Sequence, residues 1–251
     1  GTIHMIPKEK YFLPPGFNVA FNKCSRIFME IDMDDMNDLS KIMGIMDKVF
    51  MEDDKKLSDL LQEEEYSKIK DYFDHMGLPM MMLDRMKPLF LNALAGTDGN
   101  PMALKDGSYK SYEMELSQMA EKSNKELLGL ETIDFQLSIF DKIPYKVQAK
   151  MLFDAVSADS SKSDHTDVMF DQYVKQDLHQ MSESIETGDL SLKPYLSLLL
   201  FERNKDWIPK MKAEMEKGSC FFAVGAGHLG GQGGVLQLLS NEGYSISRVK
   251  E

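Results

Sequence analysis

Two short motifs of the form Gly-x-x-His, one at each end of the chain, hold the residues best suited to chemistry. They are Gly1-Thr-Ile-His4 and Gly225-Ala-Gly-His228. An imidazole titrates near neutral pH and binds metal ions, so it can serve as a general base or as a metal ligand. A lone histidine is usually structural, but two histidines in matching motifs are harder to explain in that way. The pattern therefore predicts a functional site built from both ends of the chain, around His4 and His228.

The second motif sits in a glycine-rich turn between a strand and a helix. Ser219–Val224 is an apolar, β-rich run, and Val235–Asn241 has a helical pattern. Small residues between them would let His228 project at the carboxyl edge of a sheet, where open α/β folds bind ligands. The start of the following helix would favour an anion or a developing oxyanion.

The same turn also matches the dinucleotide-binding pattern G-x-G-x-x-G at Gly225–Gly230. That pattern needs an acidic residue about 20 positions later, at the tip of the next strand. Here the corresponding region carries Arg248, Val249 and Lys250. Nucleotide binding is therefore disfavoured.

Three further polar residues stand at positions where they could join the site. Glu30 ends the predicted strand Ser25–Ile31, and Glu131 ends a second apolar stretch. A carboxylate that leaves a buried strand is costly unless it is paired, bound to a metal or solvated, although either glutamate could instead cap the next helix. Arg203 follows a run of leucines, so it could pair with a carboxylate or clamp a substrate carboxylate or oxyanion.

The elements that would position these residues predict an α+β fold. Both ends read as strand, Gly-x-x-His turn, short helix and strand, with Tyr244–Val249 as the last strand. Residues 1–31 and 219–251 would form the two halves of a mixed central sheet. Residues from about 32 to 217 would form a mainly helical insertion, in which Glu126–Glu131 is a short buried strand. We expect one domain over residues 1–251.

Composition narrows the functional classes. The chain of 251 residues is 43% apolar and shows no run long enough to span a membrane. Its formal charge of −12 argues against a nucleic-acid partner, because phosphate binding needs clustered Lys and Arg. Cys24 and Cys220 are too few for a disulfide framework, and whether they pair stays open. The 20 methionines are explained as core filler or, alternatively, as the lining of a peptide groove formed by Met80–Met82 and the stripe from Met33 to Met46.

The ordered set of motifs resembles the TraB/GumN group, which includes the TIKI metalloproteases, and is more remotely similar to the erythromycin esterase and ChaN-like fold. The resemblance rests on Gly1-Thr-Ile-His4, Phe28-Met-Glu-Ile-Asp32, Gly129-Leu-Glu-Thr132 with Gln136, Glu202-Arg-Asn204 with Trp207, and Val224-Gly-Ala-Gly-His-Leu-Gly230 with Gly243-Tyr244. It implies a mixed sheet flanked by helices and paired Gly-x-x-His motifs at one active site. In TIKI-type members it implies peptide hydrolysis supported by Mn²⁺ or Co²⁺. It also implies a strand ahead of Gly1 that positions His4, and an exported, envelope-associated protein, while a cytoplasmic location stays open.

The leading hypothesis is a metal-dependent peptidase acting on a peptide or protein. His4, Glu30 and His228 would bind the metal, Glu131 would be a further ligand or the general base, and Arg203 would steady the oxyanion or the substrate. The His-Glu-x-x-His pattern of zincins is absent from the sequence. One alternative is a metal-independent esterase in which a histidine oriented by Glu30 acts as base. Another is a protein that binds peptide or metal without catalysis.

Overall fold

The computed structural model describes residues 1–32, 39–95, 107–157, 163–187 and 193–249. Two compact units divide the chain. The first comprises Gly1–Asp38, Tyr109–Ile133 and Val168–Glu251, and the second comprises Leu39–Ser108 and Asp134–Asp167. The first unit therefore takes residues from within the expected insertion as well as from both ends. A single domain over residues 1–251 stays a prediction.

A parallel sheet of three strands forms the centre of the first unit. Its order is β4 (Glu126–Glu131), β2 (Arg26–Ile31) and β5 (Cys220–Ala223), with Phe28 opposite both Leu128 and Phe222. The predicted strands at these three places are confirmed. Two short strands, β1 (Ile6–Pro7) and β3 (Tyr109–Lys110), pair antiparallel beside it. The predicted α+β class is confirmed.

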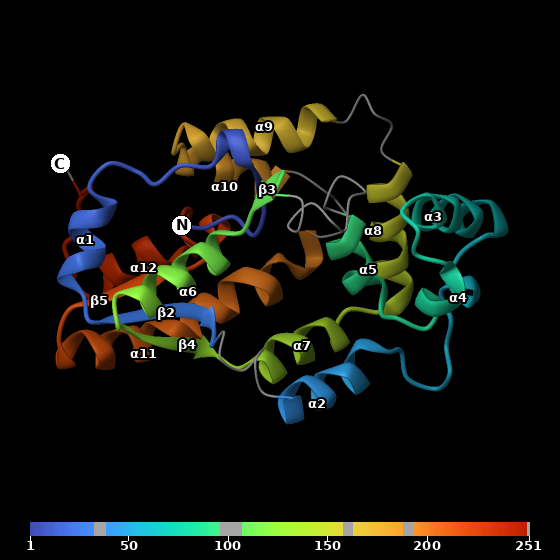
Figure 1. Cartoon of the computed structure of the whole chain (residues 1–251), viewed down its shortest axis with the longest axis horizontal. Coiled ribbons are helices and arrows are strands. Elements are labelled where there is room, and N and C mark those ends of the chain that lie inside the picture. Colours follow the sequence, from blue (N-terminus) through green and yellow to red (C-terminus); the bar gives the residue numbers. More distant parts are fainter. Residues whose placement is uncertain (33–38, 96–106, 158–162, 188–192, 250–251) are drawn as a thin grey trace. The chain divides into compact units, whose positions relative to one another are not determined.

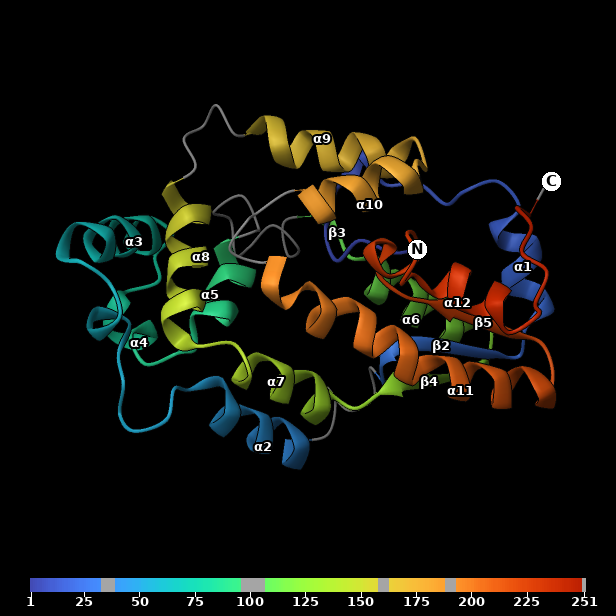
Figure 2. The same ribbon diagram turned by 180° about the vertical axis from the view of Figure 1, so that it is seen from behind.

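Helices cover both faces of this sheet (Figures 1 and 2). One face packs against α1 (Phe17–Lys23) and α6 (Tyr112–Lys122), with Ile27 and Met29 in the shared core. The other face packs against α11 (Glu202–Lys217) and α12 (Val235–Asn241), with Phe28 in that core. Because β2 lies between two strands and two helical layers, its apolar run is buried on both sides, which is typical of parallel sheets.

Shorter helical elements complete the first unit and lead to the carboxyl edge of its sheet. Ser197–Phe201 is a π-helix that runs directly into α11. Such π-turns are rare and are often found at functional sites. The other elements are the 3₁₀ turns Lys8–Lys10, Lys193–Tyr195 and Ala226–His228, and the helices α9 (Ser163–Val174), whose first residues belong to the second unit, and α10 (Leu178–Thr187).

The second unit is helical in the residues that the structure describes. Its elements are α2 (Leu39–Val49), the 3₁₀ turn Leu57–Asp59, α3 (Glu63–His75), α4 (Met80–Leu83), α5 (Pro88–Ala95), α7 (Ile133–Asp141, which begins at the last residue of the first unit) and α8 (Tyr145–Ser157). Met80 lies in the core of this unit, whereas Met81 and Met82 are 90% and 69% exposed. Met33 and Met36 of the proposed groove lie outside the described residues. The methionine-lined groove stays a prediction.

The predicted final strand, Tyr244–Val249, was wrong. This segment is irregular, and Ile246 and Val249 are 47% and 50% exposed. The Tyr244 amide donates to the Leu239 carbonyl, which ends α12 rather than starting a ladder. Alternating apolar residues form a strand only where they pair with a sheet edge and bury one face. Here only Tyr244 packs against the core, and the later apolar residues stay exposed.

Across the described residues, no helix is both long and apolar enough to cross a membrane.

Candidate active site

Three strand ends of the parallel sheet bring the predicted polar residues together. Glu30 lies near the end of β2, Glu131 ends β4, and the turn at Gly225 follows β5. Because parallel strands end at one edge of the sheet, residues far apart in sequence meet there. Arg203, in the first turn of α11, reaches into this edge from the neighbouring helix.

The guanidinium of Arg203 is the hub of the cluster. Its Nη2 donates to Glu30 Oε2 at 2.6 Å and to Glu131 Oε1 at 2.5 Å. Its Nη1 donates to the Leu199 carbonyl of the π-helix at 3.0 Å and lies 3.1 Å from Nε2 of His228. All four side chains of this cluster, Arg203, Glu30, Glu131 and His228, have exposed fractions of 13% or less. The sequence left open whether Arg203 pairs with a carboxylate, and the structure shows that it pairs with two.

Glu131 faces groups that fix its position. Arg203 Nε donates to both of its oxygens, at 3.0 and 3.2 Å, and the indole N–H of Trp207 donates to Oε2 at 3.0 Å. The Trp207 ring also packs against the guanidinium, with 5.0 Å between Arg203 Cζ and the ring centroid. These contacts favour a role for Glu131 in orienting Arg203 over its predicted role as base or ligand.

His228 is held in one orientation by Asn204. The amide nitrogen of Asn204 donates to the carbonyls of His228 and Gly233, at 3.2 and 2.8 Å. Its oxygen therefore faces His228 Nδ1 at 2.6 Å, and since that oxygen only accepts, the imidazole hydrogen lies on Nδ1. In the neutral ring Nε2 then carries the lone pair, which points toward Arg203. The Nε2 atom lies 3.7 Å from Glu30 Oε1. Burial lowers the pKa of His228 to about 4. The carboxylate of Glu30 opposes this shift, and the charge of Arg203 adds a smaller lowering effect.

Glu30 links the central strand to the second motif. Its Oε1 accepts from the Gly225 backbone N–H at 2.8 Å. A Cβ at position 225 would lie 3.1 Å from that oxygen, so glycine permits the close approach. Burial alone would raise the pKa of Glu30. The interaction with His228, the charge of Arg203 and the hydrogen bonds from Gly225 and Arg203 outweigh burial and hold the pKa of Glu30 below its usual value.

The first motif lies beside the second. The Thr2 amide donates to the Val224 carbonyl and the Ala226 amide donates to the Thr2 carbonyl, both at 2.8 Å, so Thr2 forms a parallel bridge with Gly225. The two ends of the chain therefore meet, while their joint role in function stays a prediction. His4 itself is 82% exposed, and its Nδ1 lies 3.3 Å from Glu113 Oε1. The hydrogen bond that His4 donates to Glu113 raises the pKa of His4, although partial desolvation of the ring opposes this rise. The charges of Glu30 and Arg203 act on that pKa in opposite directions.

Four residues at this site received no role from the sequence. Thr2, Asn204 and Trp207 appeared only as parts of family motifs, and Glu113 did not appear at all. Trp207 follows Arg203 by four residues and Asn204 by three, so it neighbours both on α11, which is a signal that the sequence does contain. Glu113 gave no such signal, because its partners lie at the far end of the chain. Both cysteines, Cys24 and Cys220, are free thiols.

The depressed pKa of His228 predicts a loss of stability as the pH falls. The unfolded histidine, with a pKa near 6.5, takes up a proton before the folded one does, so the folded state loses relative stability between about pH 6.5 and 4. At 1.36 kcal/mol per pKa unit the full loss is about 3 kcal/mol. Urea unfolding between pH 5 and 7.5 should show a steeper dependence in the wild type than in His228→Asn. Equal slopes would mean that His228 is not buried in its neutral form.

Known proteins show distant sequence similarity to this chain. The sequence profile of the TraB/PrgY/gumN family matches residues 1–248. The chain is 23% identical to Metalloprotease TIKI1 of Danio rerio over 297 residues, covering 98% of this chain and 59% of that protein. It is 24% identical to Metalloprotease TIKI1 of Homo sapiens over 298 residues, covering 98% and 58%. The chain is thus a distant homologue of metalloproteases and spans less than two thirds of their length. No solved structure matches it significantly.

Proposed function

Because the chain belongs to the TraB/PrgY/gumN family, we propose that it is a metal-dependent hydrolase that cleaves peptide bonds. The observation that supports this most is the arrangement of the two motif histidines. Each has its Nδ1 beside a side-chain oxygen, of Glu113 for His4 and of Asn204 for His228. Histidines that bind metals commonly donate their other ring N–H to an oxygen in this way.

The donor chemistry fits a divalent cation. Neutral imidazole nitrogens and a carboxylate are the usual ligands of such ions in hydrolases, and Mn²⁺ or Co²⁺ is the proposed ion. His4, Glu30 and His228 would hold it. Two buried carboxylates, Glu30 and Glu131, face one guanidinium, so these side chains leave a net negative charge that favours a further cation.

Two of the three proposed ligands, Glu30 and His228, lie close together, and His4 has a different partner. Glu30 Oε1 and His228 Nε2 are 3.7 Å apart, whereas His4 contacts Glu113. Over the described ranges, no three His, Cys, Asp or Glu side chains lie close enough together to hold a metal ion. Binding would therefore require the exposed His4 side chain to join the other two.

Each residue then has a defined task. The bound cation would supply Lewis acidity toward the scissile carbonyl. His228 Nε2, which is unprotonated at neutral pH, can bind the cation or accept a proton. Arg203, fixed by Glu131 and the Leu199 carbonyl, places positive charge where a developing oxyanion would be stabilised. Trp207 excludes water from the buried side of the His228 ring, with 4.6 Å between the ring centroids.

One observation favours a second function, metal-independent hydrolysis. Nη1 of Arg203 lies 3.1 Å from Nε2 of His228, so the guanidinium already provides a positive charge beside this nitrogen. In this case His228 Nε2 would take a proton from water, with Glu30 orienting the ring. An active preparation would lose turnover on chelation in the first case and retain it in the second.

Titration of metal-stripped protein with Mn²⁺ and Co²⁺ tests the leading proposal. The wild type should bind about one equivalent, since one set of ligands is proposed, and the His4→Ala/His228→Ala double variant should not. A His75→Ala/His179→Ala variant, which changes two exposed histidines, is the matched control and should bind as the wild type does. If neither ion binds to the wild type, the metal-dependent proposal fails.

The substrate and the cellular location are also proposed. We expect a peptide or protein substrate, because the distant homologues are named as metalloproteases. An exported, envelope-associated location rests on the family resemblance and would be tested by fractionating cells that produce the protein. Binding of peptide without turnover by a fully metal-loaded protein would support the non-catalytic alternative instead.

A further inference from the structure

Glu113 stands at the first Gly-x-x-His turn although it comes from a distant part of the chain. It lies in the first turn of α6, two residues after the N-cap residue Ser111. Its Oε1 accepts from the Thr2 hydroxyl at 3.0 Å, and its Oε2 accepts from the Ser111 hydroxyl at 3.0 Å. The same Oε1 lies 3.3 Å from His4 Nδ1. One carboxylate thus contacts both polar side chains of the Gly1-Thr-Ile-His4 motif.

The position of Glu113 suits an ionised carboxylate. The start of a helix stabilises negative charge. The hydroxyl groups of Thr2 and Ser111 both donate to its oxygens, and hydrogen bonds to the charged form favour that form. An ionised carboxylate only accepts hydrogen bonds, so the hydrogen of the contact lies on His4 Nδ1.

His4 needs such a partner more than His228 does. The His228 ring is buried, and Trp207 and Asn204 hold it in place. The His4 side chain is 82% exposed, so little packing restricts its rotamers. The contact with Glu113 is therefore what orients the ring.

We propose that Glu113 is the positioning residue of His4: its carboxylate holds the Nδ1 side of the ring, so that Nε2 is the nitrogen presented for chemistry. Asn204, on the opposite side of the sheet, likewise holds the Nδ1 side of the His228 ring. Each Gly-x-x-His motif is thereby completed by a side-chain oxygen from a neighbouring helix, α6 for the first and α11 for the second. What Nε2 of His4 then binds rests on the proposed function, whereas the orientation of the ring does not.

The direct test is the tautomer of His4, read from imidazole ¹⁵N shifts in the full chain at a pH where the ring is neutral. The wild type should hold its hydrogen mainly on Nδ1. Glu113→Ala should shift the hydrogen mainly to Nε2, and Glu113→Gln should restore the wild-type pattern because its amide oxygen still accepts. If Glu113→Ala does not fold, Glu113→Asp provides the comparison, since it keeps the charge but shortens the reach, and it should shift the tautomer in the same direction.

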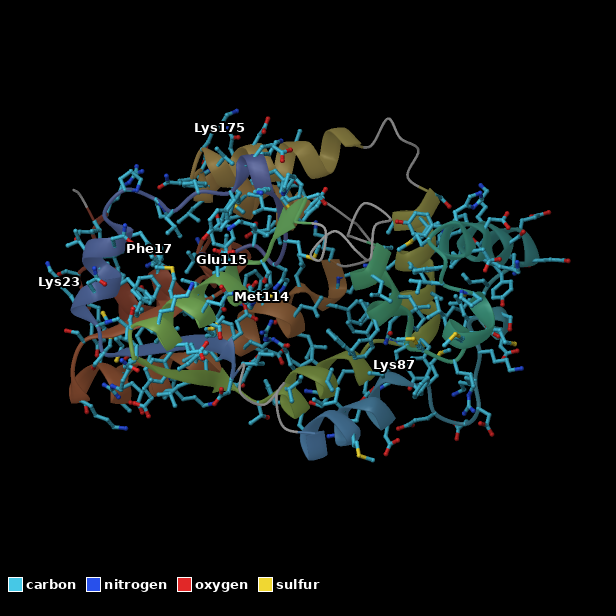
Figure 3. The ribbon with its side chains drawn as sticks, in the orientation of Figure 1. Phe17, Lys23, Lys87, Met114, Glu115 and Lys175 are labelled. Atoms are coloured by element: carbon cyan, nitrogen blue, oxygen red, sulfur yellow. The ribbon has the colours of Figure 1, made fainter. Side chains whose placement is uncertain are left out.

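Glu115→Ala is the matched control. Glu115 lies on the same helix (Figure 3) but pairs with Lys110 at 2.8 Å, away from His4. Its removal should leave the His4 tautomer unchanged. A His4 tautomer that is the same in Glu113→Ala and in the wild type would overturn the proposal.

Activity and metal binding give a second readout that separates the two proposals. Residues that orient metal-binding or catalytic histidines typically change affinity or rate by about 10–100-fold. Glu113→Ala should therefore lower kcat or Mn²⁺ affinity by that factor with little change in KM, and Glu113→Gln should recover most of it. If the wild type neither binds metal nor hydrolyses peptides, the proposed function fails, and the tautomer still decides the role of Glu113.

Discussion

Replacing Arg203 with methionine is expected to lower the free energy of unfolding by about 3–5 kcal/mol at pH 7, because it leaves buried carboxylates without their cation. The guanidinium contacts Glu30 and Glu131, and all three side chains are largely excluded from water. Methionine fills a similar volume, so the loss comes mainly from charge rather than from a cavity. Urea denaturation at pH 7 measures the effect.

The pH dependence of this loss identifies its origin. Two uncompensated carboxylates repel each other and take up protons more readily, so the difference between variant and wild type should shrink as the pH is lowered toward 5. Lys212→Met is the control. Lys212 lies on α11, as Arg203 does, and forms an exposed ion pair with Glu242, so its replacement should change stability little at either pH. A loss below about 1 kcal/mol for Arg203→Met would show that the Glu30–Arg203–Glu131 cluster does not stabilise the fold.

Replacing His228 with alanine is expected to lower kcat/KM for a cleaved peptide by about 10²–10⁴-fold, the range typical of a lost general base. Its Nε2 is the imidazole nitrogen that faces both Arg203 and Glu30. Loss of a metal ligand would abolish turnover at least as completely. The measurement is steady-state hydrolysis with and without added Mn²⁺.

His179→Ala provides the matched control, because His179 is exposed on α10. It should retain wild-type kcat/KM. The Asn204 oxygen loses its donor in His228→Ala, so the folded fraction is measured alongside by circular dichroism. A folded His228→Ala protein with wild-type turnover would remove His228 from the reaction.

The sequence by itself determined the sheet and the placement of its polar ends. The apolar run at Ile27–Met29 predicted β2, and the run before Glu131 predicted β4, because continuous apolar stretches of this length suit a strand buried on both faces. Glu30 and Glu131 were then expected at the same sheet edge, since parallel strands end together. Repetition of one motif at both ends indicated that the ends meet, as the bridge between Thr2 and Gly225 shows.

The same local rules failed at the last segment. Tyr244–Val249 has an alternating pattern, but an alternating pattern alone does not supply a neighbouring strand. The segment stays irregular after α12. Whether a pattern becomes a strand depends on contacts with other parts of the chain, which the pattern does not contain.

Only the tertiary structure decided which groups contact one another within the site. From the sequence, Glu131 could have been a ligand, a base or a helix cap, and the structure places it against Arg203 and Trp207. It likewise pairs His4 with Glu113 and His228 with Asn204. These partners lie on helices that the sheet brings alongside the strand ends. Local periodicity determines which residues form a strand or helix, but the hydrogen-bond partner of a buried polar group depends on long-range packing, and that packing is set by the whole fold.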